Sequence, residues 1–331
     1  MKTDGTLLLK RADVAGLLSL DECIAAVEEA FRLYGEGSAE RPGVLGIHAD
    51  GGGFHLKAGL LKLSKSYFVM KANGNFFDNR RRFGLPNIQG IILLCDGENG
   101  SPLALMDSIE ITIRRTGAAT AVAARYLSRE ASSIITICGC GNQGRISLQA
   151  VSRVRPIKRV FAYDVDQSQA RRFALELSEQ LGIEIEAVDE LRSAVGQSDI
   201  CVTCTPSREY FLKQEYVAPG TFVAGVGADS EEKQELDPLL LSSNKVVTDI
   251  LDQSATIGDL HHAIERGLMA KTDTHAELGE IVAGKKSGRS SEEEIVIFDS
   301  TGMALQDAAA AVIVYERAVG AGLGMRMNFA E

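Results

Sequence analysis

The chain has 331 residues, of which 45% are hydrophobic, and a formal net charge of −10 at pH 7. This length suggests two domains of ordinary size, each able to bury a core. The negative charge argues against nucleic acid or an anionic membrane as a partner, because both would repel the chain. Lys10, Arg11 and Asp13 interrupt the apolar stretches near the start. Neither a signal peptide nor a membrane span is therefore predicted, and we expect a cytoplasmic protein.

The first third of the chain is predicted to form a helix followed by short strands. Ser19-Leu-Asp-Glu22 is a capping box, and the helix that it begins is expected to end at Gly35. Alternating apolar runs predict antiparallel strands at 44–49, 54–59, 67–72 and 88–95. A long Ala-rich helix is then expected over 107–127.

Residues 134–164 have the pattern of a dinucleotide-binding unit. A β-rich run is followed by Gly139, Gly141 and Gly144 in the Gly-x-Gly-x-x-Gly spacing, and then by an amphipathic helical stretch. The first glycine permits a tight turn, the second lets the backbone approach a pyrophosphate, and the third lets helix and strand pack closely. The helix N-terminus presents free N–H groups to the phosphates. The combination predicts a bound dinucleotide.

The acid at the end of the next apolar run bears on the choice of cofactor. Asp164 follows the glycines by about 20 residues, where a carboxylate accepts hydrogen bonds from a ribose diol and repels a 2′-phosphate. NAD is therefore favoured over NADP. Arg171 and Arg172, further along the next helix, keep NADP as a lesser alternative.

From residue 134 onward, predicted strands and helices alternate. Apolar runs predict strands at 134–138, 160–163, 183–188, 200–204, 222–226, 246–249 and 295–298. Helical segments separate most of them, which is the pattern of a parallel, doubly wound sheet with ligand sites beyond the carboxyl ends of its strands. No strand is predicted after the final helix, 303–319, so this helix is expected to pack back on the first domain.

We therefore predict an α/β protein with a Rossmann doubly wound parallel sheet in residues 128–302. Residues 1–127 and 303–331 are expected to form a discontinuous α+β domain that binds the substrate.

No metal site is predicted from the cysteines and histidines. Cys201 and Cys204 form a Cys-x-x-Cys pair, but their side chains should diverge on a strand, and no histidine at ligand spacing accompanies them. The six cysteines are typical of small buried thiols in a reducing compartment. The absence of a Gly-x-Ser-x-Gly elbow and of a Walker loop argues against a hydrolase or a kinase.

Three charged residues at the ends of predicted elements could carry chemistry, and each has a plain structural alternative. Lys71 ends an apolar strand and could polarise a carbonyl or an imine, or protect a sheet edge. Arg115 could hold a carboxylate in a bidentate pair, or be solvated like its neighbour Arg114. Asp229 follows a buried strand and should lie at the carboxyl rim of the sheet, or merely cap the next turn.

Several segments together resemble the ornithine cyclodeaminase and μ-crystallin family over nearly the whole chain. The matching segments, in order, are Phe68-Val-Met-Lys71-Ala-Asn73-Gly, Leu103-Ala-Leu-Met-Asp107, Ile113-Arg-Arg115-Thr116-Gly-Ala-Ala, Gly139-Cys-Gly-Asn142-Gln143-Gly144, Gly225-Val-Gly-Ala-Asp229, Lys233-Gln-Glu-Leu-Asp237, Leu278-Gly-Glu-Ile-Val-Ala-Gly284 and Phe298-Asp-Ser-Thr-Gly-Met-Ala-Leu-Gln-Asp307.

The resemblance implies a homodimer formed through the substrate-binding domain, and it implies roles for single residues. Lys71 and Arg115 would hold the substrate carboxylate and polarise the reacting carbon, with Arg41 as a second carboxylate-binding arginine. Asp229 would act on the nitrogen or on a water. The resemblance implies cofactor contacts at Thr116, Gln143, Asp164, Thr205 and Val226. With the glycine loop, the predicted cofactor site also includes Gly139, Gly141, Asn142 and Gly144.

Family members differ in chemistry, and two residues bear on the choice. The acid that matches Asp229 is absent from μ-crystallin-like sequences, so Asp229 favours an enzyme over a binding protein. The resemblance implies an acidic ligand for ornithine's side-chain amine. In this chain Lys57 stands near that position, and its positive charge would repel the amine.

We therefore expect an NAD(H)-dependent oxidoreductase that acts on the C–N bond of a small amino or imino acid. A cyclic ketimine reductase acting on Δ1-pyrroline-2-carboxylate is the leading hypothesis. The alternatives are an ornithine cyclodeaminase, an alanine-dehydrogenase-like enzyme and a non-enzymatic μ-crystallin-like binding protein.

Overall fold

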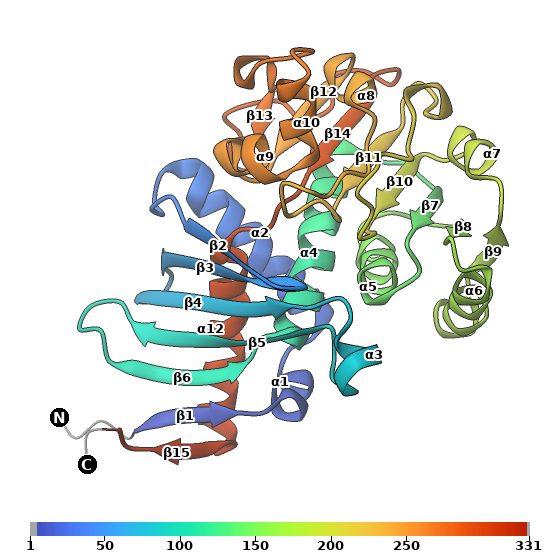
Figure 1. The fold of residues 1–331 in the computed structure, drawn as a ribbon. Coiled ribbons are helices and arrows are strands. Elements are labelled where there is room, and N and C mark those ends of the chain that lie inside the picture. Colours follow the sequence, from blue (N-terminus) through green and yellow to red (C-terminus); the bar gives the residue numbers. More distant parts are fainter. Residues whose placement is uncertain (1–4, 330–331) are drawn as a thin grey trace. The chain divides into compact units, whose positions relative to one another are not determined.

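The computed structural model describes residues 5–329, which form two compact units (Figure 1). Unit 1 consists of Met1–Arg115 with Met303–Glu331, and unit 2 of Thr116–Gly302. The chain passes from the first to the second within one helix, α4 (Ile109–Leu127). In the described part of the chain, no helix is long and apolar enough to cross a membrane.

Unit 1 is built on a seven-stranded mixed sheet with the order β15-β1-β6-β5-β4-β3-β2. Strands β2 to β6 pair antiparallel in sequence, and β1 pairs parallel with β6. The strands are β1 (Thr6–Leu9), β2 (Gly43–Ala49), β3 (Gly52–Lys62), β4 (Ser66–Asn75), β5 (Ile88–Asp96), β6 (Pro102–Asp107) and β15 (Met325–Met327).

One face of this sheet is covered by helices. The last helix, α12 (Ala304–Ala321), packs on β3, β4 and α2 (Leu20–Glu36), while α1 (Arg11–Leu17) packs on β6 and α12. Gly59 lets α12 approach closely, because a Cβ there would lie 3.1 Å from Leu305 Cδ2 and 3.4 Å from the Cβ of Ala304. A short helix, α3 (Asn79–Phe83), joins β4 to β5. The C-terminal helix thus completes the core of the N-terminal unit.

The structure corrects three sequence expectations in this unit. The second helix does not end at Gly35, because it continues to Glu36 and Gly37 takes the left-handed cap conformation at φ 81°. The last helix is followed by a strand after all, β15, which pairs with β1. Strands β1, β6 and β15, of four, six and three residues, were not predicted as strands.

Unit 2 contains an eight-stranded parallel sheet with the order β13-β12-β14-β11-β10-β7-β8-β9. Its strands are β7 (Ile134–Cys138), β8 (Arg159–Tyr163), β9 (Glu184–Val188), β10 (Ile200–Thr203), β11 (Phe222–Gly225), β12 (Lys245–Thr248), β13 (Ala276–Glu277) and β14 (Val296–Asp299). The order runs outward in both directions from β7 and β10, which confirms the predicted doubly wound Rossmann sheet. In such a sheet the ligand lies at the carboxyl ends of the strands, where the order reverses.

Helices and short 3₁₀ turns connect these strands. They are α5 (Asn142–Val151), α6 (Gln167–Leu181), α7 (Leu191–Gly196), η1 (Gln214–Tyr216), α8 (Pro238–Ser242), α9 (Leu251–Ile257), α10 (Asp259–Glu265), η2 (Lys271–Asp273) and α11 (Leu278–Val282).

The glycine loop between β7 and α5 has two tight positions and one open one. Gly139 has φ +99°, and a Cβ there would meet the Cys204 carbonyl oxygen at 2.8 Å. A Cβ on Gly144 would lie 2.1 Å from the Gly139 carbonyl oxygen, whereas nothing lies within 4 Å of one on Gly141. Gly144 therefore lets α5 pack on its own loop, and Gly141 leaves space above it.

This contrast predicts different effects of two similar substitutions. Gly144→Ala should lower the free energy of unfolding by about 1–3 kcal/mol, because the added methyl overpacks the loop. Gly141→Ala should leave thermal unfolding, followed by near-UV circular dichroism, close to that of the wild type. Equal melting temperatures for Gly144→Ala and the wild type would contradict the close approach.

Candidate functional site

Lys71 is buried on an interior strand. On β4, Tyr67, Val69 and Lys71 alternate toward the covered face of the sheet, and Lys71 is only 3% exposed. Because β4 lies between β3 and β5, Lys71 does not protect a sheet edge. A lysine buried this deeply needs a partner.

That partner is Asp307, in the first turn of α12. The Lys71 Nζ lies 2.9 Å from its Oδ1 and 2.8 Å from its Oδ2. Arg115, on α4, donates from Nε to the same Oδ1 at 3.1 Å and from Nη1 to the Gln306 Oε1 at 3.0 Å. Asp307 is fully buried and Arg115 is 6% exposed. One carboxylate thus joins two cations from different elements of unit 1.

Burial and charge oppose each other in this cluster. Burial lowers the pKa of Lys71 to about 7, and the nearby Arg115 adds to the effect while Asp307 opposes it. Burial also raises the pKa of Asp307, but Lys71 and Arg115 outweigh it and hold that pKa below its usual value. Asp307 is therefore ionised at neutral pH, and Lys71 is close to its titration point.

Lys57 adds a further positive charge. It lies on β3 directly opposite Lys71 and is only 6% exposed. Its charge lowers the pKa values of both Lys71 and Asp307. Like charges on opposed residues of neighbouring strands destabilise a sheet. A buried group of this composition is suited to an anionic ligand.

Gln306 provides a second indication of a ligand. Its side chain is fully buried, and its Oε1 is occupied by Arg115, which fixes the orientation of the amide. Its Nε2 has no hydrogen-bond partner within the described structure. A buried donor without an acceptor is costly, and a carboxylate beside Arg115 would supply one.

The two other arginines considered at this site differ from Arg115. Arg114 lies 3.7 Å from Glu110 and is partly exposed, so Arg115 is the one that faces the buried cluster. Arg41 precedes β2 and is exposed.

In unit 2, the start of α5 has the shape of a pyrophosphate site. Gly141 is the N-cap, it is exposed, and the space above it is open. Asn142 begins the helix, and the side-chain Oε1 of Gln143 is buried without a hydrogen-bond partner in the described structure. Free N–H groups at a helix N-terminus favour phosphate. These residues fit a dinucleotide.

Asp164 is held against the same loop. Its Oδ2 accepts a hydrogen bond from the Cys140 N–H at 2.8 Å, and its Oδ1 accepts one from the Asp166 N–H at 2.9 Å. A carboxylate has about four lone-pair sites, so capacity remains for a ribose diol.

The other expected cofactor contacts lie on three elements of unit 2. Thr205 follows β10, Val226 follows β11, and Thr116 lies on α4 and is 8% exposed. Thr203 on β10 is level with Cys138 on β7, so Thr205 lies at the same sheet edge as the glycine loop.

Asp229 lies beyond β11, at the carboxyl rim of this sheet. Its Oδ1 accepts a hydrogen bond from Lys233 Nζ at 2.6 Å, and its side chain is 37% exposed. Burial lowers the pKa of Lys233, but Asp229 and Glu235 outweigh burial and raise this pKa, so this partner is a cation. Asp229 therefore combines an accessible carboxylate with a charged neighbour.

A histidine and acid group not expected from the sequence lies on α10. The potential ligand atoms of His261, His262 and Glu265 are within 4.8 Å of one another, which is close enough for a metal ion. In the structure, His261 Nε2 lies 3.2 Å from Glu265 and His262 Nε2 lies 2.8 Å from the Lys233 carbonyl oxygen.

Sequence patterns assign no role to Asp307 or Gln306. Their signal was an adjacent Gln and Asp at the start of an otherwise apolar, Ala-rich helix. A charged residue in such a segment is rarely buried without a partner. Its partner could not be identified, because Lys71 and Asp307 are 236 residues apart.

The chain is similar to known proteins over nearly its whole length. A model of the ornithine cyclodeaminase/mu-crystallin family matches residues 5–322. Alanine dehydrogenase of Archaeoglobus fulgidus is 40% identical over 325 residues, which is 98% of each chain.

Two solved structures have a similar fold. An archaeal alanine dehydrogenase dimer with bound NAD has a TM-score of 0.92 and 40% identity, covering 98% of this chain and 99% of that one. Thermococcus litoralis Δ1-pyrroline-2-carboxylate reductase, in complex with NADH and L-proline, has a TM-score of 0.92 and 36% identity, covering 97% and 100%.

The electrostatics of Lys71 predict a pH dependence. A lysine binds a carboxylate when protonated, so affinity should fall as pH rises through about 7. We expect the Ki of a dead-end carboxylate such as propionate, measured with saturating NADH, to be flat below pH 6. Above pH 7 it should rise, by up to about tenfold per pH unit.

The matched variant is Lys71→Arg, because a guanidinium stays charged throughout this range. Its Ki should be flat from pH 6 to 9, whatever its absolute value. The same pH dependence in the variant and the wild type would contradict the assignment to Lys71.

Proposed function

This chain belongs to the ornithine cyclodeaminase/mu-crystallin family, and we propose that it reduces an α-imino acid with NADH, with Δ1-pyrroline-2-carboxylate as the first candidate substrate. It is an NAD-dependent enzyme that acts on amino or imino acids. The observation that carries the proposal is the buried cluster in which two cations, Lys71 and Arg115, share the carboxylate of Asp307.

In this proposal the substrate carboxylate binds to Arg115 and Lys71. The planar guanidinium suits bidentate pairing, and Gln306 Nε2 gains the acceptor that it lacks. Asp307 fixes both cations before the substrate arrives, so little ordering is left to be done on binding. The protonated Lys71 also withdraws electrons from the neighbouring imine carbon.

The cofactor site uses unit 2. The start of α5 would hold the pyrophosphate and Asp164 the adenosine ribose, which favours NAD over NADP. NADH supplies the hydride that the imine carbon accepts. The C=N electron pair moves to nitrogen as this bond forms, and Asp229 relays a proton to that nitrogen to give the amine.

The alternatives differ in what supports them. Alanine dehydrogenation is supported by the 40% identity to an enzyme of that name. Ornithine cyclodeamination is opposed by Lys57, whose charge acts on the same site as Lys71 and would repel a side-chain ammonium. A binding protein without activity is opposed by Asp229, an accessible acid at the catalytic rim of the sheet.

The reductase proposal predicts stoichiometric chemistry. With added Δ1-pyrroline-2-carboxylate, each proline formed should consume one NADH, followed at 340 nm and by amino-acid analysis. L-Ornithine with catalytic NAD should release no ammonia. Ammonia and proline from ornithine without net NADH change would overturn the reductase in favour of the cyclodeaminase.

Asp229→Asn should lower kcat by about hundredfold or more, because it removes the proton relay while NADH binding is kept. Glu231→Gln, an exposed acid in the same segment, is the matched control and should turn over like the wild type. Wild-type kcat in Asp229→Asn would remove Asp229 from the mechanism.

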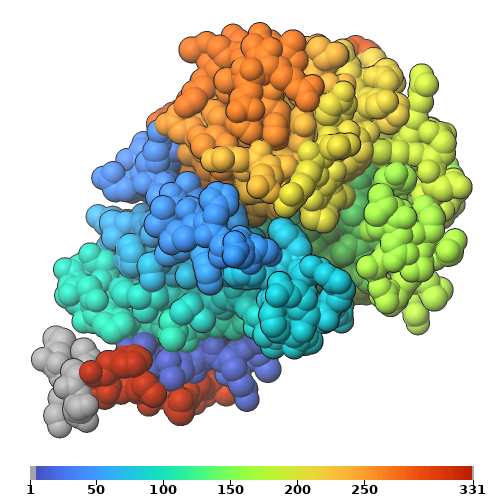
Figure 2. Space-filling model, in the orientation of Figure 1, coloured from blue at the N-terminus to red at the C-terminus, as the bar shows by residue number. Residues whose placement is uncertain are grey.

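We also propose that the chain is a homodimer through the uncovered face of the unit 1 sheet, as the archaeal alanine dehydrogenase structure is a dimer. On this face a row of apolar residues crosses neighbouring strands in register. The row consists of Met325, Leu8, Leu105, Leu93 and Met70. In Figure 2, the segments that contain these strands lie on the visible surface, coloured blue to teal except for the red segment of β15.

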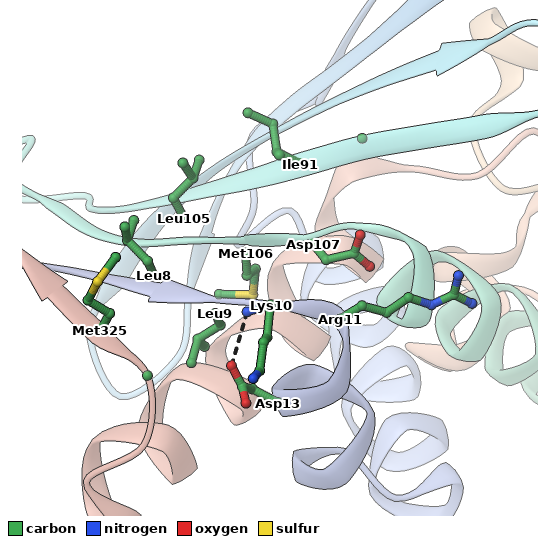
Figure 3. A pocket seen from close by; sticks show the side chains of 12 residues that line it. Leu8, Leu9, Lys10, Arg11, Asp13, Ile91, Leu105, Met106, Asp107 and Met325 are labelled. Atoms are coloured by element: carbon green, nitrogen blue, oxygen red, sulfur yellow. Dashed lines mark hydrogen bonds between the residues drawn. The ribbon is translucent and has the colours of Figure 1, made fainter. Parts of the chain in front are cut away.

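The hollow in Figure 3 lies on this face and contains none of the buried cationic residues. Its apolar wall includes Leu8, Ile91 and Met325, and Arg11 and Asp107 lie at one end. Ile91 is 47% and Met325 60% exposed. An extended apolar sheet face of this kind usually marks a protein interface.

Sedimentation should give twice the chain mass of 35.5 kDa for the wild type. Ile91→Lys should shift the protein toward the single-chain mass, because it places a charge within the apolar face. Val165→Lys is the matched control, since Val165 is 93% exposed on unit 2. A monomeric wild type, or a dimer that Ile91→Lys leaves intact, would contradict this interface.

A further inference from the structure

A fully buried carboxylate joins two loops at the carboxyl edge of the unit 2 sheet. Glu235, shortly before α8, accepts four hydrogen bonds. Its Oε1 accepts from the Thr205 N–H at 2.6 Å and from the Thr205 hydroxyl at 2.7 Å. Its Oε2 accepts from the Thr203 hydroxyl and from the Gly227 N–H, both at 2.8 Å. Both oxygens are therefore fully used.

The groups that Glu235 holds lie at the carboxyl ends of β10 and β11, where we expect the nicotinamide. Thr203 ends β10 and is level with Gly225 at the end of β11, so Thr205 and Gly227 begin neighbouring loops. The Thr205 side chain also packs against the glycine loop, because a Cβ on Gly139 would lie 3.0 Å from its Cγ2. A Cβ on Gly227 would lie 2.6 Å from the Glu235 carboxylate. The Glu235 carboxylate thus contacts the loop after β10 and the loop after β11 directly.

We propose that Glu235 is a positioning residue that sets the nicotinamide half of the cofactor site by tying the loop after β10 to the loop after β11. The expected effect of Glu235 on cofactor affinity requires only that the chain binds NAD(H). Its consequence for turnover rests on the proposed function, because Gly227 leads directly to Asp229. Two residues before Glu235, Lys233 pairs with Asp229 at 2.6 Å. The segment 233–235 therefore supports both the pocket and the proposed acid.

Glu235 lies next to two further buried carboxylates, and burying three such groups costs more free energy than joining two loops would require. The N–H groups of Glu235 and Leu236 donate to Asp259 Oδ1 at 2.8 and 2.9 Å. Asp299 in turn accepts from the Asp259 and Leu260 N–H groups at 3.2 and 2.9 Å. Three fully buried acids thus follow one another behind the cofactor edge. Burying carboxylates is unfavourable, and such costs are typical of functional sites.

Glu235→Gln tests the proposal with little change of shape. A glutamine has one acceptor oxygen, so its NH₂ must face either the Thr205 N–H or the Gly227 N–H. One loop is then no longer held. We expect the Kd for NADH, measured by fluorescence titration without substrate, to rise at least tenfold, and the Kd for ADP-ribose to change less than twofold.

ADP-ribose separates positioning from general damage, because it lacks the nicotinamide but uses the glycine loop and Asp164. Glu294→Gln is the matched control. Glu294 also accepts backbone N–H groups, from Ser290 and Ser291, but it precedes β14 at the opposite edge of the sheet. Its NADH Kd should stay within twofold of the wild type, even if its melting temperature falls.

Thr203→Val is a milder variant if Glu235→Gln does not fold. Thr203 is fully buried, and valine keeps its shape while removing one hydrogen bond to Glu235. NADH should bind about threefold more weakly and ADP-ribose as in the wild type. A parallel loss of NADH and ADP-ribose affinity, or no loss of either, would overturn the proposal. Absence of reductase activity would instead count against the proposed function and leave this binding result intact.

Discussion

The double pairing of Asp307 with Lys71 and Arg115 is the interaction on which the substrate half of this enzyme depends. Its carboxylate is fully buried and connects β4, α4 and α12, which are far apart in the sequence. Removing one partner of such a pair typically costs about 3–5 kcal/mol, because a charge is left buried alone. The Ala-rich surface of α12 brings Asp307 to this depth, and its position in the first helical turn favours a negative charge. The C-terminal helix α12 therefore supplies the carboxylate that pairs with both cations of the site, and these cations come from the N-terminal segment.

The two units use opposite charges for their separate tasks. In unit 1, Lys57 and Lys71 face each other across neighbouring strands, and this repulsion lowers stability in return for affinity toward an anion. In unit 2, buried acids accept hydrogen bonds from backbone N–H groups at the carboxyl edge of the sheet. These acids position the backbone and do not attract a charged ligand. Burial raises the pKa of Asp299 to about 7 and that of Asp259 well above its ordinary value. The backbone N–H groups that donate to Asp259 and Asp299 oppose this shift and favour the charged carboxylates.

Sequence patterns predicted the parts of the structure that depend on local spacing. The doubly wound sheet follows from strand and helix alternation, and β7 matches its predicted range because a buried parallel strand is a continuous apolar run bounded by a glycine turn. Short strands such as β15 carry too few residues to show a period. Gly35 was predicted as a helix end because it is the first glycine after the apolar positions, whereas the actual cap is Gly37. In the site, Lys71 and Arg115 could be selected as charged residues in apolar settings. Their common partner Asp307, and the loops joined by Glu235, depend on contacts between distant segments, which no local pattern encodes.

The central claim is that Asp307 acts on substrate binding through Lys71 and not independently of it. A double-mutant cycle with Asp307→Asn and Lys71→Met, read as the Ki of a dead-end carboxylate with saturating NADH, tests this most directly. Residues that act as one unit are strongly non-additive. We predict that Asp307→Asn weakens binding at least tenfold in the wild type and less than twofold when Lys71 is already methionine. Equal losses in both backgrounds would contradict the account.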